Sequence, residues 1–286
     1  MTTTAWGFIQ PRASLADLPV EAIHQELAIS IKGGHRASFD SFRGVNKVFD
    51  DIAARAGTFS VGYEDQCSAK YYFDLFDCLR SCYGEIDRVV EVGVFMGGAS
   101  VILAGCGEKL DFELDLVDVN PRFLLFSYER IRRTFPEQAR RVRLFLGDLP
   151  TYVRDVLLQE PDVTAMVQHD GSHEFNQVVR DLGSLHYAHP RIHSLAIQDT
   201  HLRGLPHQLN FVDAAVCAVF GFEAVFAPLG TSYSEYDHDV TTPNRFEGNY
   251  FLPGRPEGMY LTMAANTFHY PHPAISLESF LPKPSP

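Results

Sequence analysis

The part of the sequence that most constrains the fold is a run of valines followed by three glycines, within residues 89–100. The valines are β-branched and stand close together, which favours a strand with little exposed face. The glycines, which permit a sharp turn and a close approach of the backbone to a ligand, are Gly93, Gly97 and Gly98. A short apolar helix is expected from Ala99 to Cys106. A strand, a glycine turn and a helix in this order present helix N–H groups to a bound cofactor.

Strands and helices alternate from residue 87 onward. Strands are expected at 88–93, 112–118, 142–146, 163–168, 194–198, 222–227 and 259–265. Between most of them lie helical patterns, one of which opens with Asn120 as N-cap and Pro121 at the first helical position. This alternation predicts an α/β fold, a Rossmann-like doubly wound sheet that is mostly parallel with a last antiparallel strand.

The segments around this pattern predict the domain organisation. Residues 1–66 show helical patterns and no strand pattern, which indicates an N-terminal helical cap. Residues 67–268 are the expected ligand-binding domain, in which 228–258 is a long aromatic loop on the substrate side. Residues 269–286 form a Pro-rich tail.

Composition limits the classes of partner. The 286 residues carry a formal net charge of −12, and Lys and Arg form no run, so neither nucleic acid nor a membrane surface is an expected partner. No apolar run approaches ~18 residues, and the start of the chain lacks a signal-peptide pattern, so a cytoplasmic location is expected. The five cysteines form no C-x-x-C pair and are expected to be free thiols. The cap and the tail are compatible with a homodimer.

An acidic residue stands at the carboxyl end of each of the first five expected strands. Single carboxylates are common there, because Asp favours turns and helix starts. Ligands of parallel α/β sheets bind beyond the carboxyl ends of the strands, so five acids at these ends are expected to line one cleft. They are Glu91, Asp118, Asp148, Asp170 and Asp199.

The spacing of the glycines distinguishes between two cofactors. Asp118 lies about 20 residues beyond Gly98, where an acidic residue can accept hydrogen bonds from ribose hydroxyls of either NAD or S-adenosylmethionine (SAM). A dinucleotide turn has a glycine where this chain has Phe95, whose side chain would obstruct a pyrophosphate. SAM has no pyrophosphate, and its cationic sulfonium suits an acidic cleft. The sequence therefore favours SAM.

At this point the sequence resembles a known family. The residues Glu91-x-Gly93-x-x-x-Gly97-Gly98, Asp118 and Gly147-Asp148 resemble the successive motifs of class I SAM-dependent methyltransferases. Asp170-Gly171-Ser172-His173, followed by Asp199-Thr200, resembles the metal-dependent small-molecule O-methyltransferases, including the group that methylates sugar hydroxyls on natural products. The resemblance covers roughly residues 66–230.

The resemblance implies a set of cofactor contacts. Gly93 and its neighbours Phe95, Gly97 and Gly98 would hold the methionine part of SAM. Glu91 would lie beneath the turn, Asp118 would take the ribose hydroxyls, and Asp148 would accept from the adenine amino group. For Asp148, capping of the helix that starts near Pro150 is the plainer alternative.

The resemblance also implies a metal and a base. Asp170 and Asp199 would bind a divalent cation, expected to be Mg²⁺, with Thr200 as a third ligand, and His173 would act with Asp170 in catalysis as the general base. Related sites often carry a second acidic or amide residue beside the equivalent of Asp199, where this chain has Gln198 and Thr200. A metal-free enzyme therefore stays open. So does a structural role, since Asp residues also serve as turns and caps.

The function expected from these features is transfer of a methyl group from SAM to a hydroxyl of a small molecule, a sugar or natural-product intermediate. One alternative is a metal hydroxylase or oxygenase in which His169, Asp170 and His201 hold iron. Adjacent residues of a strand point to opposite sides, which counts against that ligand set. The other alternative is a protein of SAM-binding fold that binds a metabolite without catalysis.

Overall fold

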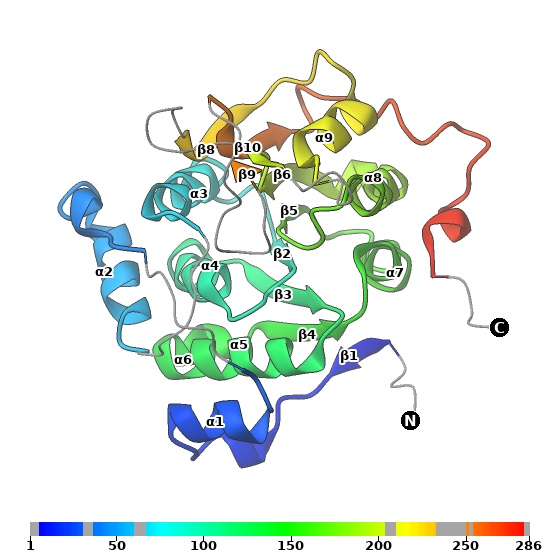
Figure 1. Ribbon diagram of the computed structural model, residues 1–286. Helices are drawn as coiled ribbons and strands as arrows, with labels where there is room; N and C mark the ends of the chain where they lie inside the picture. The colour runs from blue at the N-terminus through cyan, green and yellow to red at the C-terminus, as the bar shows by residue number, and fades with distance from the viewer. Residues whose placement is uncertain are drawn as a thin grey trace. The chain divides into compact units, whose positions relative to one another are not determined.

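The structure is a computed structural model that describes residues 6–30, 37–59, 67–203, 210–232, 250–251 and 254–282 (Figure 1). The chain divides into two compact units, residues 1–147 and 148–286. We call them unit 1 and unit 2. The domain boundaries expected at residues 66 and 268 stay predictions.

Four strands lie in the described part of unit 1. They are β1 (Gly7–Ile9), β2 (Arg88–Val92), β3 (Glu113–Asp118) and β4 (Val142–Leu146), in the order β1-β4-β3-β2. Strands β2, β3 and β4 are parallel, while β1 is antiparallel to β4. Every residue of β2 is buried, as its run of β-branched residues predicts. Val92 pairs with Val117, so the turn after β2 begins beside the last residue of β3.

The described helices of unit 1 are α1 (Val20–Glu26), α2 (Lys47–Ala56), α3 (Ala69–Ser81), α4 (Gly98–Leu110), α5 (Pro121–Thr134) and α6 (Pro136–Ala139). Three of them, α2, α3 and α5, begin after a residue whose side chain caps the helix. Asn46 accepts hydrogen bonds from two N–H groups at the start of α2, and Ser68 accepts one at the start of α3. Asn120 caps α5, with Pro121 at the first helical position as predicted.

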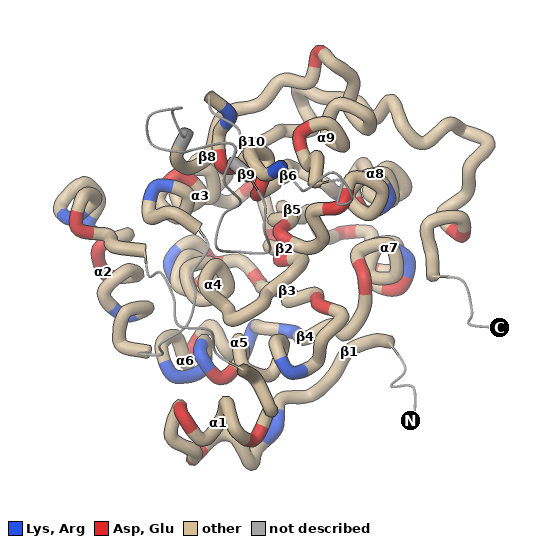
Figure 2. The backbone as a smooth tube through the Cα atoms, in the orientation of Figure 1, with Lys and Arg blue, Asp and Glu red and all other residues tan. Residues whose placement is uncertain are grey.

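Helices α2 and α3 pack on α4 and form part of the core of unit 1. The Phe49 ring lies 5.0 Å from Phe73 and 5.5 Å from Phe76, which joins α2 to α3. Basic and acidic residues are interspersed along α2 (Figure 2), and Arg55 pairs with Glu108 of α4. The helical pattern predicted for the N-terminal segment is therefore present, and these helices bury their apolar faces against the α/β part of the unit. The expectation that this segment contains no strand is wrong, because β1 pairs with β4.

Unit 2 contains a second set of strands. They are β5 (Ala165–His169), β6 (Ile192–Gln198), β8 (Ala227–Ser232) and β10 (Pro256–Thr262), in the order β5-β6-β10-β8. Strands β5 and β6 are parallel, and β10 is antiparallel to both β6 and β8. The short strands β7 (Leu202–Arg203) and β9 (Tyr250–Phe251) form a separate antiparallel pair.

The helical segments of unit 2 lie between these strands. They are α7 (Leu149–Tyr152), a π-helical turn (Val153–Leu157), α8 (Phe175–Ser184), a 3₁₀ segment (Leu185–Arg191) and α9 (Val212–Phe220). Helix α8 packs against α7 and α9. The tail folds back onto this unit: the Tyr187 hydroxyl donates to the Ile275 carbonyl, and Arg180 donates to the carbonyl of Phe280, the last residue of a 3₁₀ turn. No helix in the described part of the chain is long and apolar enough to cross a membrane.

The predicted fold class, an α/β Rossmann-like fold with mostly parallel strands and a last antiparallel strand, is confirmed. The strand predicted at 222–227 is wrong, because 222–226 is an exposed connection and β8 begins only at Ala227. The apolar composition of this stretch is the reason for the wrong prediction. Phe222 is in fact 95% exposed, and the backbone of Val225 forms hydrogen bonds with the side chain of Asn266 rather than with a strand. The loop expected at 228–258 contains β8, β9 and the start of β10, and its residues 233–249 and 252–253 lie outside the described residues.

Gly105 tests the packing of α2 on α4. A Cβ at this position would lie 2.6 Å from Ile52 Cγ2 and 2.8 Å from Phe135 Cζ. We expect Gly105→Ala to destabilise the protein by about 1–3 kcal/mol in urea unfolding, although alanine is intrinsically better than glycine inside a helix by about 1 kcal/mol. In an Ile52→Ala background the penalty should shrink, because the clash is relieved. An equal penalty in both backgrounds would contradict this packing.

Candidate functional site

The turn between β2 and α4 has the backbone conformation for which its glycines are suited. Gly93 and Gly97 have φ angles of +82° and +72°, in the left-handed region that strains other residues. Gly97 is the N-cap of α4, and a Cβ there would lie 2.8 Å from Ser127 Oγ. The motif glycines therefore serve two needs, a left-handed backbone and a close approach of the turn to α5.

Helix α5 holds the carbonyl groups of this turn. Ser127 Oγ donates to the Phe95 carbonyl at 3.4 Å, and Arg130 Nη1 donates to the Met96 carbonyl at 2.9 Å. The Phe95 side chain is 44% exposed and lies edge-on to Phe123, with ring centroids 5.2 Å apart. Phe95 is thus available to a ligand, as its predicted cofactor role requires, and the role itself stays a prediction.

Asp118 joins the end of β3 to the turn. Its Oδ2 accepts from the Val94 N–H at 3.0 Å, and its Oδ1 accepts from the Asn120 N–H at 2.7 Å. Burial raises the pKa of Asp118, and the backbone hydrogen bonds counteract part of that rise. Each carboxylate oxygen has a second lone pair, so the carboxylate can still accept from a ligand hydroxyl.

Glu91 lies within β2 and is fully buried. Burial raises the pKa of its carboxyl to about 8, although Ser100 and the charge of Arg130 act in the opposite direction. This acid therefore lies in a low-dielectric environment and is largely protonated at neutral pH, while its predicted place beneath the turn stays a prediction.

Asp148, in unit 2, is already engaged by protein groups. Its Oδ1 accepts from the Thr151 N–H at 3.0 Å, which makes it the N-cap of α7. Its Oδ2 accepts from Arg180 Nη2 at 2.8 Å. The capping role is thus present in the structure, and the predicted adenine contact would have to share these oxygens.

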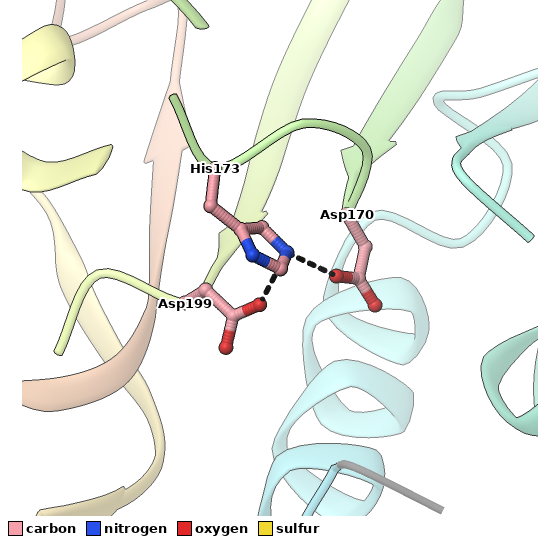
Figure 3. A group of neighbouring side chains, drawn as sticks. All are labelled: Asp170, His173 and Asp199. Carbon is pink, nitrogen blue, oxygen red and sulfur yellow. Dashed lines mark ion pairs between the residues drawn. The ribbon is translucent and has the colours of Figure 1, made fainter. Parts of the chain in front are cut away.

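Asp170, His173 and Asp199 come together in unit 2 (Figure 3). Asp170 directly follows β5, Asp199 directly follows β6, and His173 stands in the turn before α8. His173 Nε2 lies 2.8 Å from Asp199 Oδ2 and 4.0 Å from Asp170 Oδ1. One ligand atom from each residue falls within 4.8 Å of the others, a spacing at which a metal ion could be held.

Asp199 is buried in a strained conformation. Its φ angle is +63°, which is uncommon outside glycine, and its residue is 7% exposed. Burial alone would raise the pKa of Asp199, but the charge and hydrogen bond of His173, together with the charges of His201 and His169, lower the pKa. The following residue is anchored to β10, where Thr200 N–H donates to the Glu257 carbonyl and Thr200 Oγ1 to the Pro256 carbonyl.

Gln198 belongs to the same cluster, and the motif did not assign it a role. The terminal amide atom that faces the acids lies 2.6 Å from Asp170 Oδ1 and 2.8 Å from Asp199 Oδ2. As nitrogen, this atom donates to both carboxylates. A cation bound there would instead need the amide turned so that its oxygen faces the carboxylates. Its place beside Asp199 in the sequence was the signal that could have identified it.

His169 contacts a different acid from those of the cluster. Its Nε2 lies 3.1 Å from Asp181 Oδ2 of α8, and Gln177 donates to the other oxygen of that carboxylate. His201 is buried, and among the described residues it does not join Asp170 and His169 in a group with metal-ligand spacing. The structure therefore lends no support to the iron site considered from the sequence.

No model of a known protein family matches this chain, and no curated protein matches it. Among solved structures it is similar to the calicheamicin methyltransferase CalS11, with 13% identity over 89% of this chain and 95% of that one and a TM-score of 0.44. It is also similar to the O-methyltransferase TomG from Streptomyces achromogenes, involved in tomaymycin synthesis and solved with SAM, with 15% identity over 63% and 72% and a TM-score of 0.37. The N-terminal domain of EvdMO1, solved with S-adenosylhomocysteine and D-fucose, shows 10% identity over 86% and 81% and a TM-score of 0.38. Because these likenesses are distant, the proposals below are argued from this chain's own residues.

The raised pKa of Glu91 can be tested through the pH dependence of the protein's stability. Between the ordinary carboxyl pKa and the folded value of about 8, the folded protein holds a proton that the unfolded chain releases. Stability should therefore fall as pH rises through this window, by up to about 1.4 kcal/mol per pH unit. Glu91→Gln lacks this loss, so urea unfolding at pH 5, 6.5 and 8 should show the variant gaining on wild type as pH increases. A gap that stays constant would contradict the buried acid, and Glu26→Gln, at an exposed site on α1, is the matched control.

Proposed function

We propose that this protein is a SAM-dependent O-methyltransferase that acts on a hydroxyl of a small molecule, with a divalent cation and His173 as general base. The observation that carries the proposal is the Asp170–His173–Asp199 cluster, in which a histidine lies 2.8 Å from one acid and 4.0 Å from another. Transfer to a hydroxyl needs a proton acceptor and a means of orienting the oxygen, and this cluster offers both.

The cofactor assignment rests on the turn of unit 1. Its left-handed glycines let the chain approach a ligand closely, and Asp118 hydrogen-bonds the turn at the Val94 N–H. The half-exposed Phe95 side chain stands where a pyrophosphate would need a glycine. These features support SAM over a dinucleotide. The substrate class, a sugar or natural-product intermediate, rests on the resemblance of the sequence motifs.

The reaction uses His173 to move a proton. His173 Nε2 lies 2.8 Å from Asp199 Oδ2 and donates to it, so the other ring nitrogen, Nδ1, takes the proton of the acceptor hydroxyl, and the carboxylate stabilises the imidazolium that forms. The oxygen forms a bond to the methyl carbon as the bond from that carbon to sulfur breaks. The electron pair of the broken bond remains on sulfur, so the cationic sulfonium leaves as a neutral thioether.

The residues of the cluster fit a hard cation. Asp170 and Asp199 provide carboxylate oxygens, and the amide of Gln198, whose terminal atom lies 2.6–2.8 Å from both acids, could turn its oxygen toward a cation between them as a third ligand. The Thr200 hydroxyl donates its proton to the Pro256 carbonyl and keeps its lone pairs, so it stays the alternative third ligand. When bound, such a cation would lower the pKa of a substrate hydroxyl and orient it.

Binding and turnover test the proposal together. Calorimetry should show S-adenosylhomocysteine binding in the micromolar range and no binding of NAD. With a panel of hydroxylated sugars and phenols and labelled SAM, His173→Ala should lower kcat by about 10²–10⁴-fold while leaving S-adenosylhomocysteine affinity nearly unchanged. Absence of S-adenosylhomocysteine binding would overturn the proposal, and binding without turnover of any acceptor would favour a non-catalytic protein.

A metal titration tests the proposed cation ligands separately. Mn²⁺ titration followed by electron paramagnetic resonance should show one site that Asp170→Asn and Asp199→Asn weaken at least tenfold. Gln198→Leu should weaken it and Gln198→Glu should strengthen it, because a carboxylate adds charge to the same ligand position. Asp162→Asn, at an exposed acid of the same unit, is the control. Wild-type affinity in both aspartate variants would rule out the assigned ligands.

A further inference from the structure

Two arginines of unit 2 share a single carboxylate, that of Asp213 in the first turn of α9. Arg203 Nη2 lies 2.7 Å from Asp213 Oδ2, and Arg255 Nε lies 3.7 Å from the same oxygen. In the described part of unit 2, neither arginine forms an ion pair with a second acid. Two guanidinium groups therefore face one negative charge, in a chain whose formal net charge is −12.

The protein already uses these two arginines to different extents. Besides its pair with Asp213, Arg203 donates through Nη1 to the Leu202 carbonyl at 2.7 Å and to the Thr200 carbonyl at 3.4 Å, so it joins β7 to α9. The Arg255 side chain is 49% exposed, and its one ion pair among the described residues is the 3.7 Å approach of Nε. Exposed pairs contribute little to stability. The guanidinium of Arg255 is therefore available to a ligand.

Both arginines lie next to the acid–histidine cluster of this unit. Thr200, which directly follows Asp199, accepts from Arg203 through its carbonyl. Its hydroxyl donates to the carbonyl of Pro256, the residue after Arg255. Consecutive Cα atoms lie about 3.8 Å apart, and each of these links spans only one or two residues. A sugar or phenol whose hydroxyl is at the cluster can therefore extend to Arg255.

The surplus charge indicates the class of group that would bind there. A guanidinium pairs with a carboxylate or a phosphate through two parallel hydrogen bonds. A carboxylate carries one negative charge, which matches the one positive charge that Asp213 leaves uncompensated, whereas a phosphate monoester carries about −1.5 to −2 at pH 7. Phe211, which is 36% exposed and whose ring centroid lies 5.0 Å from the guanidinium carbon of Arg203, adds an apolar surface beside the two cations.

We propose that Arg255, next to the Arg203–Asp213 pair, binds a carboxylate of the methyl acceptor, so that the enzyme selects a hydroxy acid over a neutral hydroxylated molecule. The inference rests on the proposed function and deepens it by naming an ionic group of the acceptor. The acids of the cluster would repel such a group, so the acceptor binds with its hydroxyl at the cluster and its carboxylate at Arg255. Arg255 takes no part in the proton transfer.

The test compares acceptors that differ only in the charged group. D-Glucuronate and D-glucuronamide form one pair, and 3,4-dihydroxybenzoate and 3,4-dihydroxybenzamide form the other. Ligand-observed NMR in the presence of S-adenosylhomocysteine gives the dissociation constants, and labelled SAM gives kcat/KM. Wild type should bind the acid of at least one pair about fivefold or more tightly than the amide, as expected for a half-exposed charge pair. D-Glucose 6-phosphate should bind more weakly than D-glucuronate.

Variants of the arginine and of its acid should shift this preference in opposite directions. Arg255→Gln should abolish the preference for the acid while its affinity for the amide stays within about twofold of wild type, and Arg255→Lys should keep part of the preference. Asp213→Asn should increase the preference, because it removes a competing carboxylate. Arg154→Gln is the matched control, since Arg154 is an arginine of the same unit with a 45% exposed side chain and its own acid, Asp155.

The possible results separate the two proposals. If wild type binds no S-adenosylhomocysteine and methylates no acceptor, the proposed function fails and this inference fails with it. If S-adenosylhomocysteine binds but neither acid is preferred to its amide, only the carboxylate site is wrong. The same holds if Arg255→Gln retains the full preference, or if D-glucose 6-phosphate binds more tightly than D-glucuronate. Should a variant not fold, the comparison of acid and amide on wild type still decides whether a carboxylate is recognised.

Discussion

The carboxylate of Asp118 accepts the hydrogen bonds on which the rest of unit 1 depends. One oxygen accepts the Val94 N–H of the glycine turn, and the other accepts the Asn120 N–H just before α5. Asn120 in turn caps α5, and that helix donates to the carbonyls of the turn from Ser127 and Arg130. A single acid thus couples the end of β3, the turn and the helix that braces it. Burial raises its pKa, so the backbone N–H groups are what keep a charge tolerable there.

Unit 2 also contains a buried carboxylate, which a different set of groups stabilises. Asp199 is buried in a left-handed conformation, which a non-glycine residue adopts only where its surroundings impose it. Strand β10 provides that constraint by binding the N–H and hydroxyl of Thr200. His173 compensates the charge of the carboxylate and lowers its pKa. The strain and the paired charge occur at the residue to which the reaction chemistry is assigned, which is where such costs are generally found.

What the sequence could predict follows from how local each signal is. The alternation of elements, the cap Asn120-Pro121 and the glycine turn depend on neighbours within a few residues, and the structure bears them out. The position of β8 was missed because the apolar run before it lies in an exposed connection. The Asp148–Arg180 pair joins residues 32 positions apart, and no local sequence pattern predicts it. Gln198 stands beside a recognised motif residue, but only the short distances from its amide to both carboxylates show that it belongs to the cluster.

The two candidate clusters are each assembled within one unit. The turn, Asp118 and Arg130 all lie between β2 and the end of α5, and the acids with His173 lie between the ends of β5 and β6. Each cluster therefore forms with the packing of its own unit, from residues fewer than about 45 positions apart, and loop closure over such lengths costs little more than over shorter ones. The groups proposed to bind the cofactor and the groups proposed to transfer the proton therefore belong to different units. A change near Asp199 can therefore alter that cluster while the turn, braced by α5, keeps its left-handed glycines.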